Sequence, residues 1–348
     1  MSRRSFIKQL ATLALGASLP ALARAQGGAF VPYARRETVQ VFIDAVAARN
    51  DLSRRWIERT FAQGQYLPAV ERLMQPPIPF GQRNWREYRA RYVEERRIRE
   101  GVAFRQLHRT ALQRAADRYG VPPEIVTAIL GVETQYGRLT GGFRTLDVLL
   151  TLSFDYLRRA AYFREELEQF MLLAREQRLD PLAVRGSFAG AIGIPQFMPS
   201  SVRKWAVDFD GDRRIDLMRS AADSIGSVAN FLAVHGWQRD EPILLTATPD
   251  EETDEDALAV LTEEFGGIRA DTPWSALTGR GLDVDAALPL DLPILLVDLP
   301  YVDADGATRR EYRLGTASFS AILHYNRSYF YATSVVELAQ ALRERAAG

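Results

Sequence analysis

Glu133 is the residue whose type and position most directly suggest chemistry. It lies near the end of the stretch VPPEIVTAILGVETQYG, residues 121–137. On a helix its neighbours one turn earlier are Ile129 and Leu130, both aliphatic. Removal of water raises the pKa of such a carboxyl and keeps it protonated near neutral pH, as a general acid requires. The alternative is a glutamate at a helix end that simply reaches water.

The residues around Glu133 are expected to form a short helix. Pro122 and Pro123 suit a first helical turn, where no backbone donor is lost, and Gly137 suits the end of the helix. Aliphatic residues recur between them at helical spacing: Ile125, Val126, Ile129, Leu130 and Val132.

A glycine- and proline-rich segment, GSFAGAIGIPQFMPSS (residues 186–201), offers amide and hydroxyl groups but no acid. Its composition disfavours a regular helix or strand. Such a loop lets a bulky ligand approach the backbone, and Ser187 and Gln196 are able to hydrogen-bond sugar hydroxyls or amides. A tight structural turn is an equal alternative.

A candidate cation site follows in the segment DFDGDRRID, residues 208–216. Asp208, Asp210 and Asp212 alternate there in the manner of calcium ligands. The segment departs from the standard twelve-residue loop, and Asp223, at the start of the next helix, is the residue that would close the site. We predict calcium or another hard cation. The alternative is an acidic turn that caps the helix 221–235 with its own side chains.

Three tyrosines are candidates for contact with sugar rings. Tyr325 and Tyr331 belong to HYNRSYFY, residues 324–331, which concentrates aromatic and amide groups. Tyr162 falls off the apolar stripe of a long helix, so the core does not require it. For the segment 324–331 the alternative is a packed aromatic core.

Helical periodicity covers much of the remaining chain. Residues 38–74 and 85–119 read as helices separated by PPIP at 76–79, and residues 294–314 read as a β-hairpin with its turn at 303–306. The sequence therefore predicts an α+β fold that is mainly α-helical. The expected segments are an export signal (1–25), a helical N-terminal region (26–120), a catalytic core with Glu133 and the loop 208–223 (121–240), and a small β-containing region (241–348) whose residues 319–335 return to the groove.

Composition excludes several classes of function. The 348 residues are 47% hydrophobic and include no cysteine, which excludes a disulfide, a thiol nucleophile and a lipid-anchored cysteine. The three histidines, His108, His235 and His324, lack metal-ligand spacing. Without the four basic residues of segment 1–25, 40 basic residues face 44 acidic ones, so nucleic-acid binding is disfavoured.

The N-terminus is expected to direct export. SRRSFIK at residues 2–8 has the pattern of a twin-arginine signal peptide, and an apolar run (10–19) and the small-residue site Ala23-Arg24-Ala25 follow it. The apolar run is too short for a permanent membrane helix. We expect a soluble periplasmic protein without a membrane anchor.

Four ordered motifs together resemble the lytic transglycosylase B family, glycoside hydrolase family 103. They are ETQYG (133–137), GSFAGAIGIPQFMPSS (186–201), DFDGDRRIDL leading into ADSIGSVANFLAVHGW (208–237), and HYNRSYFYA (324–332). The resemblance runs from about residue 30 to the C-terminus and implies a lysozyme-like helical core.

The resemblance implies an enzyme that cleaves the β-1,4 bond between N-acetylmuramic acid and N-acetylglucosamine in peptidoglycan and leaves a 1,6-anhydromuramoyl end. It implies that Glu133 protonates the leaving oxygen and then takes the proton from the muramoyl 6-hydroxyl. The chemistry requires no cofactor, and family members bind calcium in the Asp208 region. Residues that match the family's saccharide groove are Ser187, Gln196, Tyr325 and Tyr331, with Tyr162 where another groove tyrosine is expected.

Two rival functions remain open at this point. A standard glycosidase needs a second carboxylate, and Asp147 and Asp155 are the candidates near Glu133 in sequence. A single acid suffices if the substrate's own 6-hydroxyl attacks within the molecule. The rivals are therefore a hydrolytic muramidase and a catalytically silent peptidoglycan-binding protein. Glycan strands are the expected partner, and cell-wall synthesis proteins are candidate protein partners.

Overall fold

The computed structural model describes residues 31–75, 84–284 and 286–347. The predicted export signal and the PPIP segment lie outside the described residues. Contacts group the described chain into two compact units, each built from two separate stretches of sequence. We call residues 84–136 with 225–347 the Glu133 unit, and residues 31–75 with 137–224 the loop unit. This grouping differs from the four consecutive segments expected from the sequence, which stay a prediction.

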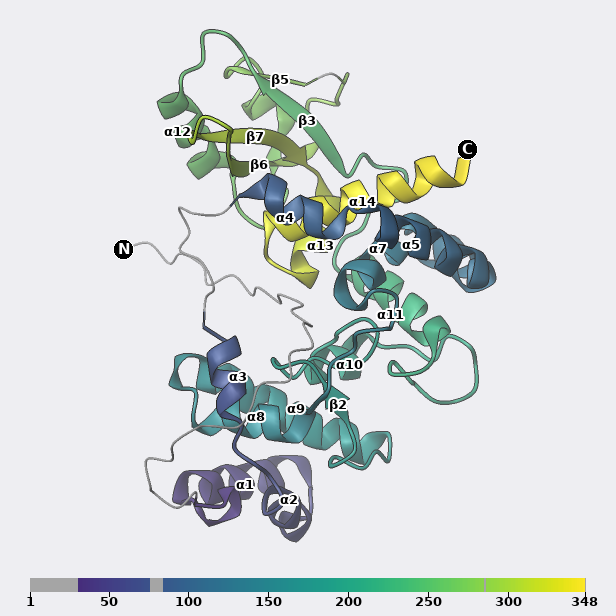
Figure 1. Cartoon of the computed structure of the whole chain (residues 1–348), viewed down its shortest axis with the longest axis vertical. Helices are drawn as coiled ribbons and strands as arrows, with labels where there is room; N and C mark the ends of the chain where they lie inside the picture. The colour runs from purple at the N-terminus through teal and green to yellow at the C-terminus, as the bar shows by residue number, and fades with distance from the viewer. Residues whose placement is uncertain (1–30, 76–83, 285, 348) are drawn as a thin grey trace. The chain divides into compact units, whose positions relative to one another are not determined.

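Helices dominate the Glu133 unit, and α7 (Pro123–Thr134) lies at its centre. Nearly every residue of α7 is buried, and it packs against α5, α6 and α14 (Figure 1). The unit's other helices are α4 (Trp85–Tyr92), α5 (Glu95–Leu107), α6 (Arg109–Tyr119), most of α11 (Ala221–Val234), α12 (Glu255–Phe265), α13 (Ala317–Tyr325) and α14 (Tyr329–Ala347), with the short helix η4 (Trp274–Ala276).

A five-stranded antiparallel sheet in the order β4-β6-β7-β3-β5 completes the Glu133 unit. Its strands are β3 (Leu244–Pro249), β4 (Thr272–Pro273), β5 (Leu282–Val284), β6 (Pro293–Val302) and β7 (Thr308–Gly315). The predicted hairpin is confirmed as β6–β7, and Gly306 takes the left-handed conformation that its turn requires, with φ of 81°. The three remaining strands had not been predicted.

Alternation along the strands explains how this sheet is covered. Ile294 and Leu296 of β6 join Leu258 and Leu261 of α12 in one apolar cluster. Leu295 and Val297 point to the opposite face and are also fully buried, and β6 contacts α4 and α14. Both faces of the hairpin are therefore packed against helices, which connects α4 and α14 rigidly to the sheet.

The loop unit is a second helical assembly with a two-stranded sheet. Its helices are η1 (Tyr33–Arg35), α1 (Glu37–Asn50), α2 (Arg54–Phe61), α3 (Pro68–Leu73), α8 (Thr145–Phe154), η3 (Leu157–Arg159), α9 (Ala160–Glu176) and α10 (Pro199–Trp205), and β1 (Phe143–Arg144) pairs with β2 (Arg185–Gly186). The predicted helix 85–119 is in fact three helices, and the region 38–74 also forms three.

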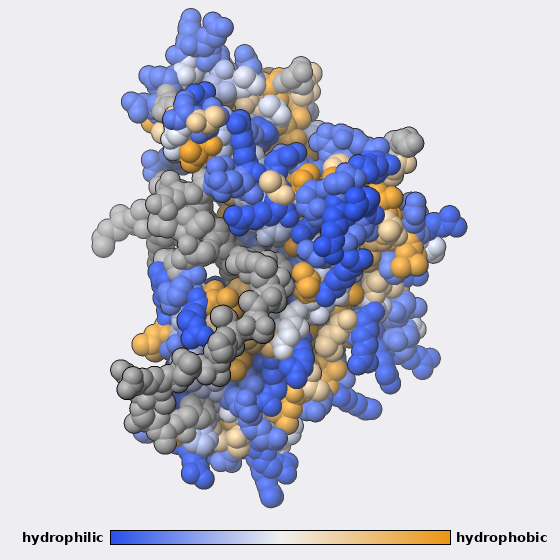
Figure 2. All heavy atoms as spheres, in the orientation of Figure 1, coloured by the Kyte–Doolittle hydropathy of each residue, from blue (hydrophilic) through white to orange (hydrophobic). Residues whose placement is uncertain are grey.

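The expected fold class, α+β with mainly α-helices, is confirmed. Figure 2 shows hydrophilic side chains over α4, α5 and α14, where Arg86, Arg89 and Arg99 are exposed. Within the described part of the chain, no helix has both the length and the apolar character needed to cross a membrane.

Candidate active site

Glu133 is buried in the last turn of α7, and only 5% of its surface is exposed. Pro123 starts the helix at its first position, as the sequence suggested. Ile129 and Leu130, one turn before the acid, are both fully buried. The helix ends at Thr134, three residues before Gly137, because Gln135 turns into the left-handed conformation with φ of 49°. The carboxyl is thus held by a helix that is enclosed on all sides.

The side chain of Tyr331 contacts the carboxyl directly. The hydroxyl of Tyr331 donates a hydrogen bond of 2.7 Å to Oε1 of Glu133. Tyr331 lies in the first turn of α14, where the Ser328 hydroxyl accepts the N–H of Tyr331 and the Ser328 carbonyl accepts that of Ala332. Ser328 therefore acts as a helix cap that sets the direction of the tyrosine.

The environment raises the pKa of Glu133 to about 7, mainly because burial disfavours the charged form. The hydrogen bond from Tyr331 opposes this shift, since it stabilises the carboxylate. Protonated and ionised forms are then both well populated near neutral pH. A group in this state can give a proton in one step and take one in the next.

Tyr325, a predicted saccharide-groove residue, is the last residue of α13. Its ring lies parallel to that of Tyr331, with centroids 6.5 Å apart and an angle of 12°. The rings of Phe231 and Tyr325 meet in a T-shaped arrangement, with their centroids 4.9 Å apart. Burial raises the pKa of Tyr325 and of Tyr331 well above the ordinary value, so both hydroxyls remain protonated. The structure therefore brings together Glu133, Tyr325 and Tyr331.

Two tyrosines of α4 also belong to this environment, and the sequence analysis missed them. The rings of Tyr88 and Tyr92 lie 4.9 Å apart, and their hydroxyls share a hydrogen bond. The charge of Glu133 contributes to the raised pKa of each, which puts both within its electrostatic reach. Their i, i+4 spacing was a usable signal, because it places both on one helix face.

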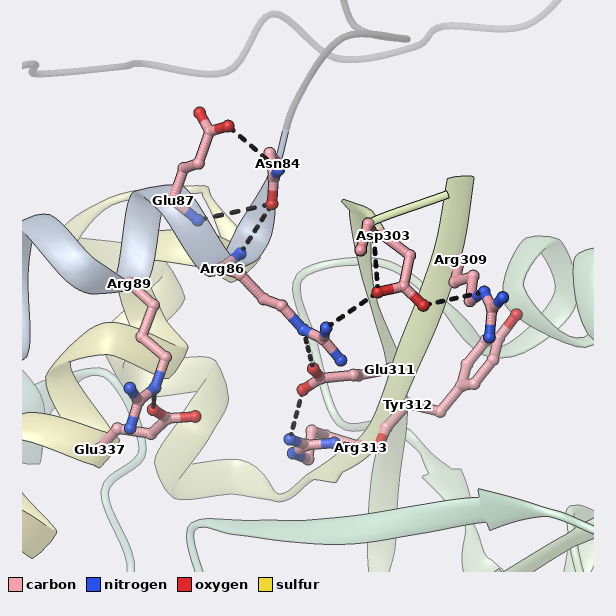
Figure 3. A network of polar contacts seen from close by, with 11 residues as sticks. Asn84, Arg86, Glu87, Arg89, Asp303, Arg309, Glu311, Tyr312, Arg313 and Glu337 are labelled. Atoms are coloured by element: carbon pink, nitrogen blue, oxygen red, sulfur yellow. Dashed lines mark hydrogen bonds and ion pairs between the residues drawn. The ribbon is translucent and has the colours of Figure 1, made fainter. Parts of the chain in front are cut away.

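A network of charges also holds α4 in place (Figure 3). Arg86 pairs with Asp303 at 3.6 Å and with Glu311 at 3.4 Å, both on the β6–β7 hairpin. Arg89 pairs with Glu337 of α14. Trp85, which is buried, packs against Phe330 with centroids 5.4 Å apart. These contacts attach the helix that carries Tyr88 to the helix that carries Tyr331.

Ser187 and Gln196 lie in the loop unit, in the predicted irregular segment. Ser187 Oγ accepts the N–H of Ala191 at 3.1 Å, and Gln196 Nε2 donates to the carbonyls of Thr140 and Gly193 at 3.1 and 2.8 Å. Gly193 has φ of 75°, and a Cβ there would come within 2.3 Å of the Leu217 carbonyl oxygen. The segment is thus a tight turn in which Ser187 and Gln196 hydrogen-bond to nearby backbone groups. Its role in binding sugars stays a prediction.

Tyr162 also lies in the loop unit, on α9. The buried stripe of this helix consists of Phe163, Leu167, Phe170 and Ala174. Tyr162 is only half-buried, in agreement with its position off the stripe, and the guanidinium of Arg159 lies 4.4 Å from its ring centroid.

The two candidates for a second catalytic acid are both engaged elsewhere in the loop unit. Asp147 pairs with Arg144 at 2.7 Å and accepts the backbone N–H of Gln65 at 2.9 Å. Asp155 accepts hydrogen bonds from Arg36 at 2.7 Å and from Tyr33 at 2.6 Å. Among the residues that the structure describes, no carboxylate contributes to the pKa shift of Glu133.

Asp208, Asp210 and Asp212 form the one group in the described chain whose carboxylates could hold a metal ion. One oxygen of each lies within 4.8 Å of the others. Hard oxygen donors at this spacing suit calcium. Asp223 is outside this group of closely spaced oxygens, and its carboxylate accepts the backbone N–H groups of Phe209 and Asp216 at 2.7 and 2.8 Å. Asp223 therefore holds the loop to the start of α11.

Comparison with known proteins gives consistent matches over nearly the whole chain. The model of the transglycosylase SLT domain matches residues 34–340. Membrane-bound lytic murein transglycosylase B of Escherichia coli K12 is 38% identical over 318 residues, which cover 89% of this chain and 84% of that protein.

Two solved structures are similar as well. Catenated lytic transglycosylase SltB1 of Pseudomonas aeruginosa has a TM-score of 0.82 and 38% identity, over 91% of this chain and 100% of that one. Lytic transglycosylase Slt35 of Escherichia coli, in complex with calcium, has a TM-score of 0.76 and 37% identity, over 91% and 94% of the two chains.

Proposed function

The chain belongs to the transglycosylase SLT family, and we propose that Glu133 is the single acid and base of its reaction. The protein is a peptidoglycan lytic transglycosylase. It cleaves the β-1,4 bond between N-acetylmuramic acid and N-acetylglucosamine and forms 1,6-anhydromuramoyl ends.

The proposed reaction moves one proton out and one proton back. Protonated Glu133 gives its proton to the glycosidic oxygen while the bond from that oxygen to C1 of the muramoyl residue breaks. The muramoyl O6 then forms a bond to C1, and the Glu133 carboxylate takes the O6 proton. The acid is regenerated and no water is consumed. A group with a pKa of about 7 suits both steps.

The observation that carries this proposal is that no carboxylate of the described residues contributes to the pKa shift of Glu133. A hydrolase with two carboxylates would place the second about 5 to 9 Å from the first. Asp147 and Asp155 are instead engaged by Arg144 and Arg36. Attack by a hydroxyl of the substrate itself removes the need for a second acid, because the nucleophile is already held near C1.

Tyrosine and amide groups are proposed as the saccharide contacts. Tyr325 and Tyr331 in the Glu133 unit present parallel rings, a geometry that suits stacking with sugar rings. Tyr162, Ser187 and Gln196 in the loop unit are proposed on the basis of the family motif. The Gln196 nitrogen is engaged by the loop, so we expect its carbonyl oxygen to face the sugar.

Calcium is proposed as a structural ion at Asp208, Asp210 and Asp212. The spacing of their oxygens supports this proposal, as does the calcium complex of Slt35. The ion would offset two of the three negative charges and stabilise the loop before α11, and it has no part in the bond cleavage.

Export to the periplasm by the twin-arginine route is proposed from the motif SRRSFIK and the apolar run that follows it. Peptidoglycan lies in that compartment. Cell-wall synthesis proteins are a proposed class of partner, since new glycan must be coordinated with cleavage.

The proposal is tested by digestion of purified sacculi with the wild type and Glu133→Gln, followed by mass spectrometry of the muropeptides. We expect anhydromuramoyl ends from the wild type and no soluble products from the variant, with sacculus binding retained. Reducing muramic ends would identify a hydrolytic muramidase. No soluble products from either protein, with sacculus binding retained, would leave only a binding protein.

A further inference from the structure

Arg97 on α5 is a buried cation that makes one long ion pair, with Glu94, in the described part of the chain. Only 7% of its surface is exposed. The nearest carboxylate oxygen belongs to Glu94 and lies 3.9 Å from Nε, and within the described part of the chain this Nε has no hydrogen-bond partner. Burial of a charge with incomplete pairing costs free energy, so a buried residue of this kind calls for a structural or functional explanation.

The guanidinium of Arg97 is directed at the end of the helix that carries the acid. Its Nη1 donates a hydrogen bond of 3.0 Å to the carbonyl of Gly131, two residues before Glu133. That carbonyl also accepts the N–H of Gln135. A positive charge at this position stabilises the negative end of the α7 dipole. The contact therefore sets the last turn of α7, where Glu133 lies.

Tyr136 closes the same turn from the other side. Its hydroxyl donates to the backbone carbonyl of Arg97 at 2.8 Å. Its ring occupies the space beside Gly131, where an added Cβ would come within 2.7 Å of the tyrosine. Tyr136 has φ of 60° and follows Gln135, which is also left-handed. Two consecutive non-glycine residues in this conformation need such support.

Arg97 also reaches the tyrosines that face the acid. Its Cζ lies 5.1 Å from the ring centroid of Tyr92, which shares a hydrogen bond with Tyr88. Arg97 thus contacts the helix that carries Glu133 and the aromatic pair on α4. The neighbouring Arg105 on α5 makes a similar bond, to the carbonyl of Leu342 at 3.0 Å, but at the C-terminal part of α14.

We propose that Arg97, supported by Tyr136, is a positioning residue that fixes Glu133 in its buried, protonatable place for the transglycosylase reaction. The inference rests on the proposed role of Glu133. Arg97 and Tyr136 do not contact the carboxyl of Glu133, but they determine the orientation of this carboxyl and its exclusion from water.

The test compares Arg97→Met with Arg105→Met, which removes an equivalent arginine–carbonyl bond from the same helix. Turnover on a soluble glycan, KM, the pH profile and Tm are measured for each. We expect Arg97→Met to lower kcat by about ten- to a hundredfold with KM changed less than about twofold, because small displacements of a catalytic group have effects of this size. Arg105→Met is expected to lower Tm and leave kcat unchanged.

The pH profile separates positioning from general stability. If the end of α7 loosens, water reaches Glu133 and its pKa falls toward the ordinary value, so the alkaline limb of kcat/KM moves to lower pH. Arg97→Lys keeps the charge and one donor, and we expect it to recover part of kcat. An unchanged limb and unchanged kcat in folded Arg97→Met would overturn the proposal.

Tyr136→Phe keeps the proposal testable if Arg97→Met does not fold. It removes only the hydroxyl that bonds to the Arg97 carbonyl, and we expect a smaller loss of kcat with a shift of the limb in the same direction. Wild-type values for both Tyr136→Phe and Arg97→Lys would contradict the inference. Full activity of Glu133→Gln would instead reject the proposed function itself, so the two failures are distinguishable.

Discussion

Glu133 and the group Asp208, Asp210 and Asp212 place acids in opposite environments. Glu133 is one carboxyl, 5% exposed, with a hydrogen bond from Tyr331 and a pKa raised to about 7. The three aspartates share a loop in which Asp210 and Asp212 are exposed. Their oxygens accept backbone N–H groups of the same loop, such as those of Gly211 and Arg213.

The difference shows that surroundings, and not the number of acids, decide which chemistry is available. Desolvation favours the neutral form of Glu133, so that carboxyl can store and deliver a proton. Clustered carboxylates with access to water remain able to attract a cation. Replacement of a carboxyl by an amide should therefore affect turnover at Glu133 and cation binding at the three aspartates.

The largest expected effect is on turnover. Glu133→Gln should lower kcat by at least about a thousandfold, because it removes the proposed proton donor and acceptor of the reaction. Asp212→Asn should change kcat less than about twofold. The measurement is the rate of release of anhydromuropeptides from sacculi. A similar loss in both variants would remove the distinction between the two regions.

The next effect concerns stability and its dependence on pH. The folded-state pKa of Glu133, about 7, lies above the ordinary value of 4.5. The stabilisation due to the neutral carboxyl is fully present below pH 4.5 and is lost as the pH rises through 7. Glutamine does not ionise, so the free energy of unfolding of Glu133→Gln does not fall in this way. Relative to the wild type, it should rise by up to about 3 kcal/mol between pH 5 and pH 8.

Urea denaturation of the wild type and Glu133→Gln at the two pH values measures this gain. Asp212→Asn, studied with a chelator present, is the control and should show no such difference. If Glu133→Gln gains nothing at pH 8, the carboxyl does not experience the desolvation inferred from its burial.

A smaller effect is expected for Tyr331→Phe. Loss of the 2.7 Å hydrogen bond destabilises the carboxylate, so the pKa of Glu133 rises further and the alkaline limb of kcat/KM moves to higher pH by about one unit. Tyr329→Phe is a matched control on the same turn of α14, since its hydroxyl bonds to Gly267. A shift in the control, or none in Tyr331→Phe, would contradict the assignment of this hydrogen bond.

The smallest effect is expected from calcium. Calcium at about tenfold over its dissociation constant should raise the stability by about 1.4 kcal/mol. Differential scanning calorimetry with calcium and with a chelator measures the change, and Asp210→Asn should reduce it. Equal Tm values in both conditions for the wild type would reject the calcium proposal, and Glu133→Gln should respond to calcium as the wild type does.

Local signals predicted several elements correctly. Pro122 and Pro123 marked the start of α7, and alternating residues with Gly306 marked the β6–β7 hairpin. Tyr88 and Tyr92 were missed because their importance depends on the packing of α4 near α7, which joins residues about 45 positions apart. The hydrogen bonds that Asp223 accepts from the backbone N–H groups of Phe209 and Asp216 could not be predicted from the sequence, and its role as a metal ligand stays a prediction.

The sequence by itself determined the element that carries the acid, the aliphatic neighbours of Glu133 and the family to which the chain belongs, because these depend on residue types at short spacing. Only the tertiary structure decided that α7 is enclosed on every side, that Tyr331 donates to the carboxyl and that Arg97 reaches Gly131. Burial and hydrogen bonds between distant segments arise from packing, and the pKa that makes Glu133 useful follows from them.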